Sequence, residues 1–226
     1  MSLSIIISII VSVVSFAVFF SYQLKFNSQV KQKREKFESL FAEGDKGYQV
    51  KTMETPEGES YMQIDGHFEE GTDLRTLIDE INDYVKKSKG TTDFSVIQNK
   101  TERLIDMRYD DSTARMSFPI YLGLMGTFCG VFIGIISFLC NVWMDSVNDD
   151  SIKGLLIGVL VSMSTSFIGL FLTTRNNYYS SDGKRKVDID KNKFYDFIQT
   201  ELMPSLDVSM VAALNKLHDT VTMFEP

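Results

Sequence analysis

Three long uncharged stretches constrain this chain more than any other feature of its sequence. Residues 3–24, 116–144 and 154–174 contain none of the 23 basic and 30 acidic residues of the 226-residue chain. About 20 apolar residues in a helix are enough to cross a hydrocarbon core that is roughly 30 Å thick. The sequence therefore predicts three membrane-spanning helices, and it excludes a soluble globular enzyme, a disordered chain and a small secreted scaffold.

The remaining composition excludes several classes of function. A net charge of -7 argues against direct binding of nucleic acid, which needs clustered Lys and Arg. Both cysteines lie in the second stretch, and the two histidines stand alone without the spacing of metal ligands. No Gly-rich phosphate loop, nucleophile elbow or intramembrane protease motif is present. We therefore expect neither an enzyme nor a bound metal or cofactor.

The charges that flank the stretches predict one topology. Basic residues follow the first and third stretches, whereas acidic residues dominate the turn between the second and third. Because basic residues favour the cytoplasmic side, we expect the N-terminus outside and the C-terminus inside. The first stretch lacks a basic leader and a small-residue cleavage site, which favours an uncleaved anchor. The predicted segments are a first span (1–24), a cytoplasmic loop (25–115), a second span (116–144), an external turn (145–153), a third span (154–174) and a cytoplasmic tail (175–226).

The cytoplasmic segments carry shorter structural signals. Residues 47–53 and 61–65 predict a small β-hairpin. Apolar residues at helical spacing predict helices over 73–89 and 94–108 in the loop. In the tail they predict two amphipathic helices, 193–203 and 209–224, separated near Pro204. The expected fold is an all-α integral membrane protein with helical cytoplasmic parts and one β-hairpin.

Small residues form regular faces on the second and third stretches. Gly123, Gly126, Gly130 and Gly134 recur every three or four residues, and Thr127 lies beside them. The third stretch has a matching face of small and hydroxyl residues, namely Ser162, Thr165, Ser166, Gly169 and Thr173. Such faces allow two helices to approach closely in lipid, and hydroxyls at membrane depth face protein or water. Two interpretations remain open, helix packing with hydroxyls bonded to their own helix, or an ion path.

The three stretches contain no Asp, Glu, His, Lys or Arg. A proton path normally requires a titratable group at membrane depth. If this chain conducts protons, the group that carries them must come from another chain.

Two motifs in the spans resemble a known family. Leu122-Gly-Leu-Met-Gly-Thr-Phe-Cys-Gly-Val resembles the Leu-Gly-Leu-Leu-Gly-Thr core of the MotA/TolQ/ExbB proton-channel family. Ser166-Phe-Ile-Gly-Leu resembles its Thr-x-x-Gly-Leu segment, with Ser166 in the place of the Thr. The N-out arrangement of three spans with a large first cytoplasmic loop is similar to TolQ and ExbB.

The resemblance implies a stator-like motor. Five copies of such a subunit surround a dimer of a single-span protein whose membrane Asp takes up and releases protons. By position, Thr127 and Ser166 would lie near that Asp, and Ser162, Thr165 and Thr173 would extend the path. The resemblance gives the glycines, including Gly169, the role of packing helices and partner together.

One departure from the family separates the possible functions. TolQ and ExbB members carry a Glu five residues before the third-span Thr, and this chain has Val161 there. The Gly-Thr-Phe form and the apolar seam of the tail look more like the channel subunit of Zorya-type anti-phage defence systems. The alternatives are a TolQ/ExbB-like energiser of envelope transport, or a non-conducting scaffold whose helices 73–89 and 209–224 recruit cytoplasmic effector proteins.

Overall fold

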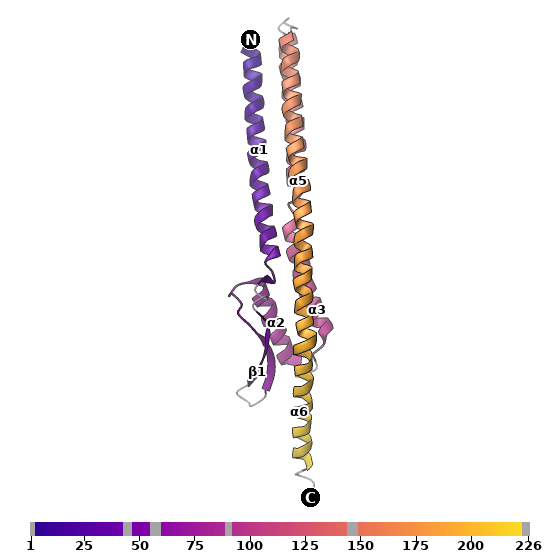
Figure 1. Ribbon diagram of the computed structural model, residues 1–226. Coiled ribbons are helices and arrows are strands. Elements are labelled where there is room, and N and C mark those ends of the chain that lie inside the picture. Colours follow the sequence, from indigo (N-terminus) through magenta and orange to yellow (C-terminus); the bar gives the residue numbers. More distant parts are fainter. Residues whose placement is uncertain (1–2, 43–46, 55–59, 89–91, 144–148, 223–226) are drawn as a thin grey trace. The chain divides into compact units, whose positions relative to one another are not determined.

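The chain is mostly helical, as its computed structural model shows (Figure 1). The structure describes residues 3–42, 47–54, 60–88, 92–143 and 149–222. The elements are α1 (Leu3–Glu38), β1 (Gln49–Glu54), β2 (Ser60–Asp65), α2 (Asp73–Ser88), α3 (Phe94–Thr113), α4 (Phe118–Trp143), α5 (Asp149–Phe197), the π-helical turn η2 (Ile198–Leu202) and α6 (Met203–Thr222). This confirms the predicted helical class and the small β-hairpin.

Three of the helical segments are long and apolar enough to cross a membrane. Their most apolar windows have mean hydropathies of 1.8, 2.2 and 2.2 and lie in α1, α4 and α5, which carry the three predicted spans. The chain is thus a multi-pass membrane protein. Both α1 and α5 continue as helix well beyond the end of the uncharged stretch that each contains.

The tail differs from the prediction. A separate helix over 193–203 and a break near Pro204 were expected, but α5 runs without interruption from Asp149 to Phe197. Between the third span and Phe197 the sequence contains no proline, so nothing there ends the helix.

Pro204 lies in the first turn of α6 and does not interrupt the chain of helices. The turn before it widens into η2, in which the Met203 N–H donates to the Ile198 carbonyl, five residues earlier. A proline ring in a helix clashes with the carbonyl four residues before it, here that of Thr200 within η2. The wider π-helical turn therefore accommodates the proline ring, and the helix continues where a break was predicted.

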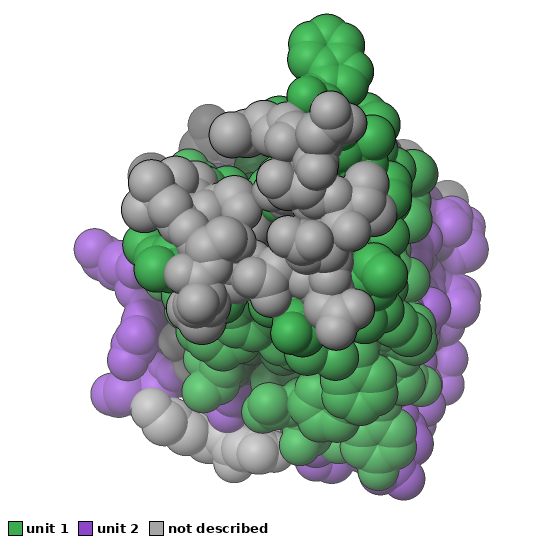
Figure 2. All heavy atoms as spheres, turned by 90° about the horizontal axis from the view of Figure 1, so that it is seen from above, with its two compact units in different colours: residues 1–35, 111–182 green, residues 36–110, 183–226 purple. Residues whose placement is uncertain are grey.

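The chain folds as two compact units, which Figure 2 distinguishes by colour. Unit 1 comprises residues 1–35 and 111–182 and contains the three spans. Unit 2 comprises residues 36–110 and 183–226 and so combines most of the predicted loop with most of the predicted tail. The helices α1 and α5 contribute residues to both units.

In unit 2, the β-hairpin is held by α2. The strands β1 and β2 pair antiparallel, with Val50 opposite Ile64. The Ile64 N–H donates to Asn82 Oδ1 (2.7 Å), and Asn82 Nδ2 donates to the Ile64 carbonyl (2.9 Å). An isolated two-stranded hairpin is marginally stable. The two hydrogen bonds from Asn82 of α2 to the backbone of β2 therefore supply support that a third strand would otherwise give.

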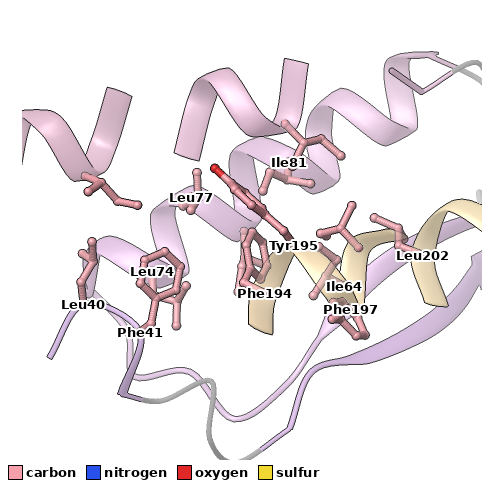
Figure 3. Close-up of a cluster of buried hydrophobic side chains, with 14 of the residues drawn as sticks. Leu40, Phe41, Ile64, Leu74, Leu77, Ile81, Phe194, Tyr195, Phe197 and Leu202 are labelled. Carbon is pink, nitrogen blue, oxygen red and sulfur yellow. The ribbon is translucent and has the colours of Figure 1, made fainter. Parts of the chain in front are cut away.

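The core of unit 2 joins the loop to the tail (Figure 3). The predicted apolar face of α2 is buried there. Against it pack side chains from the end of α1, from the turn that follows α1 and from the tail, which are Phe37, Leu40, Phe41, Phe194, Tyr195, Ile198, Leu202 and Leu206. The sequence predicted these elements separately, but it did not predict that the tail completes the core of the loop.

Candidate functional site

The glycine face of α4 lies against α5. A Cβ on Gly126 would lie 2.5 Å from Thr165 Oγ1, and one on Gly130 would lie 2.7 Å from the Ser162 Cβ. A Cβ on Gly123 would lie 3.0 Å from the Ser166 Cα. Because these distances leave no space for a side chain, glycine allows α4 and α5 to pack with their backbones in near contact.

The glycines of α5 have the same role from the other side of this contact. A Cβ on Gly158 would lie 2.8 Å from the Gly130 carbonyl oxygen, and one on Gly169 would meet the Pro119 carbonyl oxygen. Gly134 is less tight, with a Cβ position 3.3 Å from Leu155. Sequence reasoning overlooked Gly158, although it lies four residues before Ser162 and extends the same face. The surface between α4 and α5 is called the glycine seam below.

Two of the five candidate hydroxyls lie inside the glycine seam. Ser162 and Thr165 are each 2% exposed. Ser162 Oγ donates to the Val159 carbonyl (2.7 Å), and Thr165 Oγ1 donates to the Ser162 carbonyl (2.8 Å). These bonds within their own helix are what a packing role requires.

Thr127 and Ser166 lie at the edge of the seam and are half-buried. Thr127 Oγ1 donates to the Leu124 carbonyl at 2.6 Å. A hydroxyl that donates still has lone pairs with which it can accept a hydrogen bond from a neighbouring chain. Thr173 differs from both groups, because it is 7% exposed and its hydroxyl has no hydrogen-bond partner among the residues described.

The helices α4 and α5 form a helical hairpin, and contacts with α1 show which side of this hairpin faces α1. Phe26 of α1 stacks on Phe118 of α4, with ring centroids 4.9 Å apart. Nine residues, about two and a half helical turns, separate Phe118 from Thr127, so these two side chains leave α4 on opposite sides.

The side of α5 that faces α1 follows from an apolar hollow between the two helices. Val13 and Phe16 of α1 line it together with Leu160, Val161 and Ser164 of α5. Ser166 follows Ser164 by two residues, a rotation of about 200° around the helix. Thr127 and Ser166 therefore both lie on the flank of the hairpin that faces away from α1, which is called the free flank below.

Val161 lies in this apolar hollow. The resemblance described above would align it with the position where TolQ and ExbB members carry a Glu. Valine suits a space lined by Val13, Phe16 and Leu160, whereas an ionised carboxylate there would be costly.

Gln23 is a polar residue of the spans that sequence reasoning missed. Its side chain is fully buried, and Nε2 donates to the Pro119 carbonyl (3.3 Å) and to the Thr165 carbonyl (3.1 Å). One amide thus joins α1, α4 and α5. The available signal was a polar residue within an uncharged stretch, because such residues at membrane depth usually contact protein.

Two arginines near the spans lie over one aromatic ring at the basic end of the spans, the end flanked by Lys25 and Arg175. The guanidinium groups of Arg34 and Arg175 lie 4.9 and 5.6 Å from the centre of the Tyr179 ring. Aromatic and basic side chains are typical of the boundary between membrane and water. Within the described part of the chain, no three His, Cys, Asp or Glu residues come together as a possible metal site.

Comparison with known proteins adds no relative. No family model, curated protein or solved structure matches this chain. The resemblance to the MotA/TolQ/ExbB family consequently rests on the short motifs around Thr127 and Ser166.

Proposed function

We propose that this chain is the channel-forming, stator-like subunit of a proton-driven motor in the bacterial inner membrane. Five copies, each with its N-terminus outside, surround a dimer of a single-span partner whose Asp carries the protons. One observation carries the proposal: Thr127 and Ser166, the two hydroxyls that the motifs place beside this Asp, both lie half-buried on the free flank.

The chemistry of the free flank suits a partner's carboxylate. An uncharged hydroxyl can donate to a carboxylate, accept from a carboxylic acid and pass a proton between them. The spans carry no titratable Asp, Glu, His, Lys or Arg of their own, so the carboxylate must belong to the partner. The glycine seam supports this arrangement, because backbones in near contact hold the two hydroxyls on one firm hairpin.

The rest of the chain supports a proposal for the work that the motor performs. Val161 in an apolar hollow favours a channel of the anti-phage defence type over a TolQ/ExbB-like energiser of envelope transport. In this proposal, proton flow turns the ring of five subunits around the partner, and the cytoplasmic parts transmit the motion to effector proteins.

Proton flux through the reconstituted complex tests the proposal. The complex is purified with the products of neighbouring genes, placed in liposomes and driven by a pH gradient that an enclosed dye reports. Thr127→Val and Ser166→Val keep the shape of the side chains but remove the hydroxyls. Each is expected to lower the flux at least roughly tenfold, which corresponds to about 1.4 kcal/mol in the barrier.

Ser164→Ala is the matched control, because Ser164 lies on the same helix but faces the apolar hollow. Its flux is expected to equal that of the unmodified protein. Native mass spectrometry should give five copies of this chain with two of the partner for every variant. Unchanged flux in both valine variants with intact assembly would refute the proposed path.

A non-conducting scaffold is the second candidate function, and α6 is the observation that favours it. Val211 and Leu214 are 56% and 55% exposed and offer an apolar face to another protein. A scaffold predicts that Leu214→Asp abolishes recruitment of cytoplasmic proteins while the two hydroxyl variants remain silent. A proton flux that depends on Ser166 would exclude this function.

A further inference from the structure

Several buried side-chain atoms in unit 1 have no hydrogen-bond partner among the described residues, and four of them belong to neutral side chains near the basic end of the spans. These four are Gln23 Oε1 and Asn27 Oδ1 on α1, and Thr173 Oγ1 and Asn176 Nδ2 on α5. The residues Gln23, Thr173 and Asn176 are 0%, 7% and 4% exposed. These four atoms are called the polar ladder below.

Contacts between α1 and α5 show that the four atoms lie at similar positions along the axes of the two helices. Gln23 contacts α5 between Thr165 and Gly169, and Arg34, eleven residues later, lies over Tyr179. The two helices therefore run parallel along this stretch, as Figure 1 also shows.

The spacing within each helix then places the ladder. Asn27 follows Gln23 by four residues, and Thr173 follows Gly169 by four, so both lie about 6 Å further along their helices. Asn176 lies about 4.5 Å beyond Thr173, toward the basic end of the spans. Spacings of four and three residues keep each set on one face of its helix.

The cost of leaving these atoms unpaired points to a bound molecule. Each buried donor or acceptor without a partner costs about 1–3 kcal/mol, so four of them in one place would strongly disfavour the packed helices. A buried water typically makes about three hydrogen bonds to such groups. All four side chains are neutral, which suits water and not a divalent cation, whose usual ligands include carboxylates.

We propose that the polar ladder binds a short chain of ordered water molecules inside each subunit, leading toward the basic end of the spans. This inference goes beyond the proposed function, because a subunit can hold water whether or not it conducts protons. Thr173 lies seven residues, about two turns, after Ser166 on α5. A link between this water and the proton path at Ser166 would in addition rest on the proposed function.

Cysteine labelling measures the hydration directly. In a background in which Cys129 and Cys140 are replaced by Ala, single variants Thr173→Cys and Asn176→Cys are treated in membranes with a small thiol-reactive methanethiosulfonate. Only the thiolate reacts, and a thiol ionises in water but not in an apolar environment. Both variants are expected to react at least roughly tenfold faster than a thiol that faces lipid.

Phe171→Cys is the matched control, because Phe171 lies at nearly the same depth on α5 and is 58% exposed on its apolar surface. Labelling at Thr173 and Asn176 no faster than at Phe171 would overturn the proposal. Proton flux is not part of this readout, so its result is separate from that of the valine variants.

The unmodified protein provides a second test if the cysteine variants do not assemble. In lipid bilayers, water-edited solid-state NMR follows transfer of magnetisation from water to side-chain amides. The amides of Gln23 and Asn176 are expected to receive it nearly as fast as that of the exposed Asn192. Absence of transfer to both amides would mean that the ladder is dry and would overturn the proposal.

Discussion

Gln23 shows how much a single neutral residue can contribute inside a membrane protein. It donates to carbonyls of α4 and α5 from α1, so it replaces apolar packing with a directed contact between three helices. Little hydrophobic drive exists between helices in lipid, and interhelical hydrogen bonds there contribute roughly 0.6–2 kcal/mol. The residue thus acts on how α1 is held to the hairpin, and not on the hydroxyls of the free flank.

Replacing Gln23 with Leu should loosen α1. The variant loses both hydrogen bonds, and we expect the free energy of unfolding to fall by about 1 kcal/mol. Equilibrium unfolding in mixed micelles with increasing SDS measures the change. Gln32→Leu serves as the control, because Gln32 is exposed on the same helix. Equal stability of the two variants would show that the three-helix contact contributes nothing.

At the scale of elements, the glycine seam reverses the ordinary preference of a helix. In an isolated helix, Ala is more favourable than Gly by about 0.8–1.0 kcal/mol. At Gly130 of α4, the methyl group of an alanine would lie 2.7 Å from the Ser162 Cβ and 2.9 Å from the Gly158 carbonyl oxygen. Packing between helices therefore opposes propensity within the helix.

Gly130→Ala decides between these two effects. We expect it to destabilise the hairpin by about 1–3 kcal/mol, the usual cost of overpacking a tight contact. Resistance of the folded protein to SDS measures the effect, and Ser162→Gly in the same chain should restore part of the loss. Phe132→Ala, on the exposed side of α4, controls for changes in the lipid-facing surface. A more stable Gly130→Ala protein would show that the helices do not pack this closely.

At the scale of the whole molecule, unit 2 is held together by contacts between the loop and the tail. The Tyr195 hydroxyl lies 3.2 Å from Glu102 Oε1 and 3.3 Å from the Gln98 carbonyl oxygen. Burial raises the pKa of Tyr195, and the charge of Glu102 raises it further. Burial disfavours the charged form of Lys191, but its hydrogen bonds to Glu102 and Asp188 outweigh this and raise its pKa.

These shifts predict that unit 2 loses stability in alkali. A pKa that is raised in the folded state gives stability that is fully present below the unfolded value, near 10 for Tyr, and lost as the pH rises through the folded value. Thermal unfolding followed by circular dichroism between pH 7 and pH 11 should therefore show a falling midpoint above about pH 10.

Tyr195→Phe isolates the phenol. The variant should be less stable at pH 7, because it loses its hydrogen bonds, but its midpoint should fall less steeply in alkali. Tyr178→Phe is the control, because Tyr178 is 72% exposed. Identical alkaline slopes for all three proteins would assign the loss of stability to other groups.

The features that the sequence determined by itself are those that depend on local pattern. The three spans follow from the length of the uncharged stretches, the buried face of α2 from its apolar spacing, and the small faces from glycines every three or four residues. The tertiary structure decided which partner each face meets. It buried Ser162 and Thr165 while leaving Thr127 and Ser166 half-buried, and it joined three helices through Gln23. It also extended α5 to Phe197, continued the helix through Pro204 by way of η2 and α6, and packed the tail into the core of the loop. Helical periodicity fixes the direction of a side chain around its own axis, but contacts between residues about 40 to 140 positions apart choose what lies in that direction.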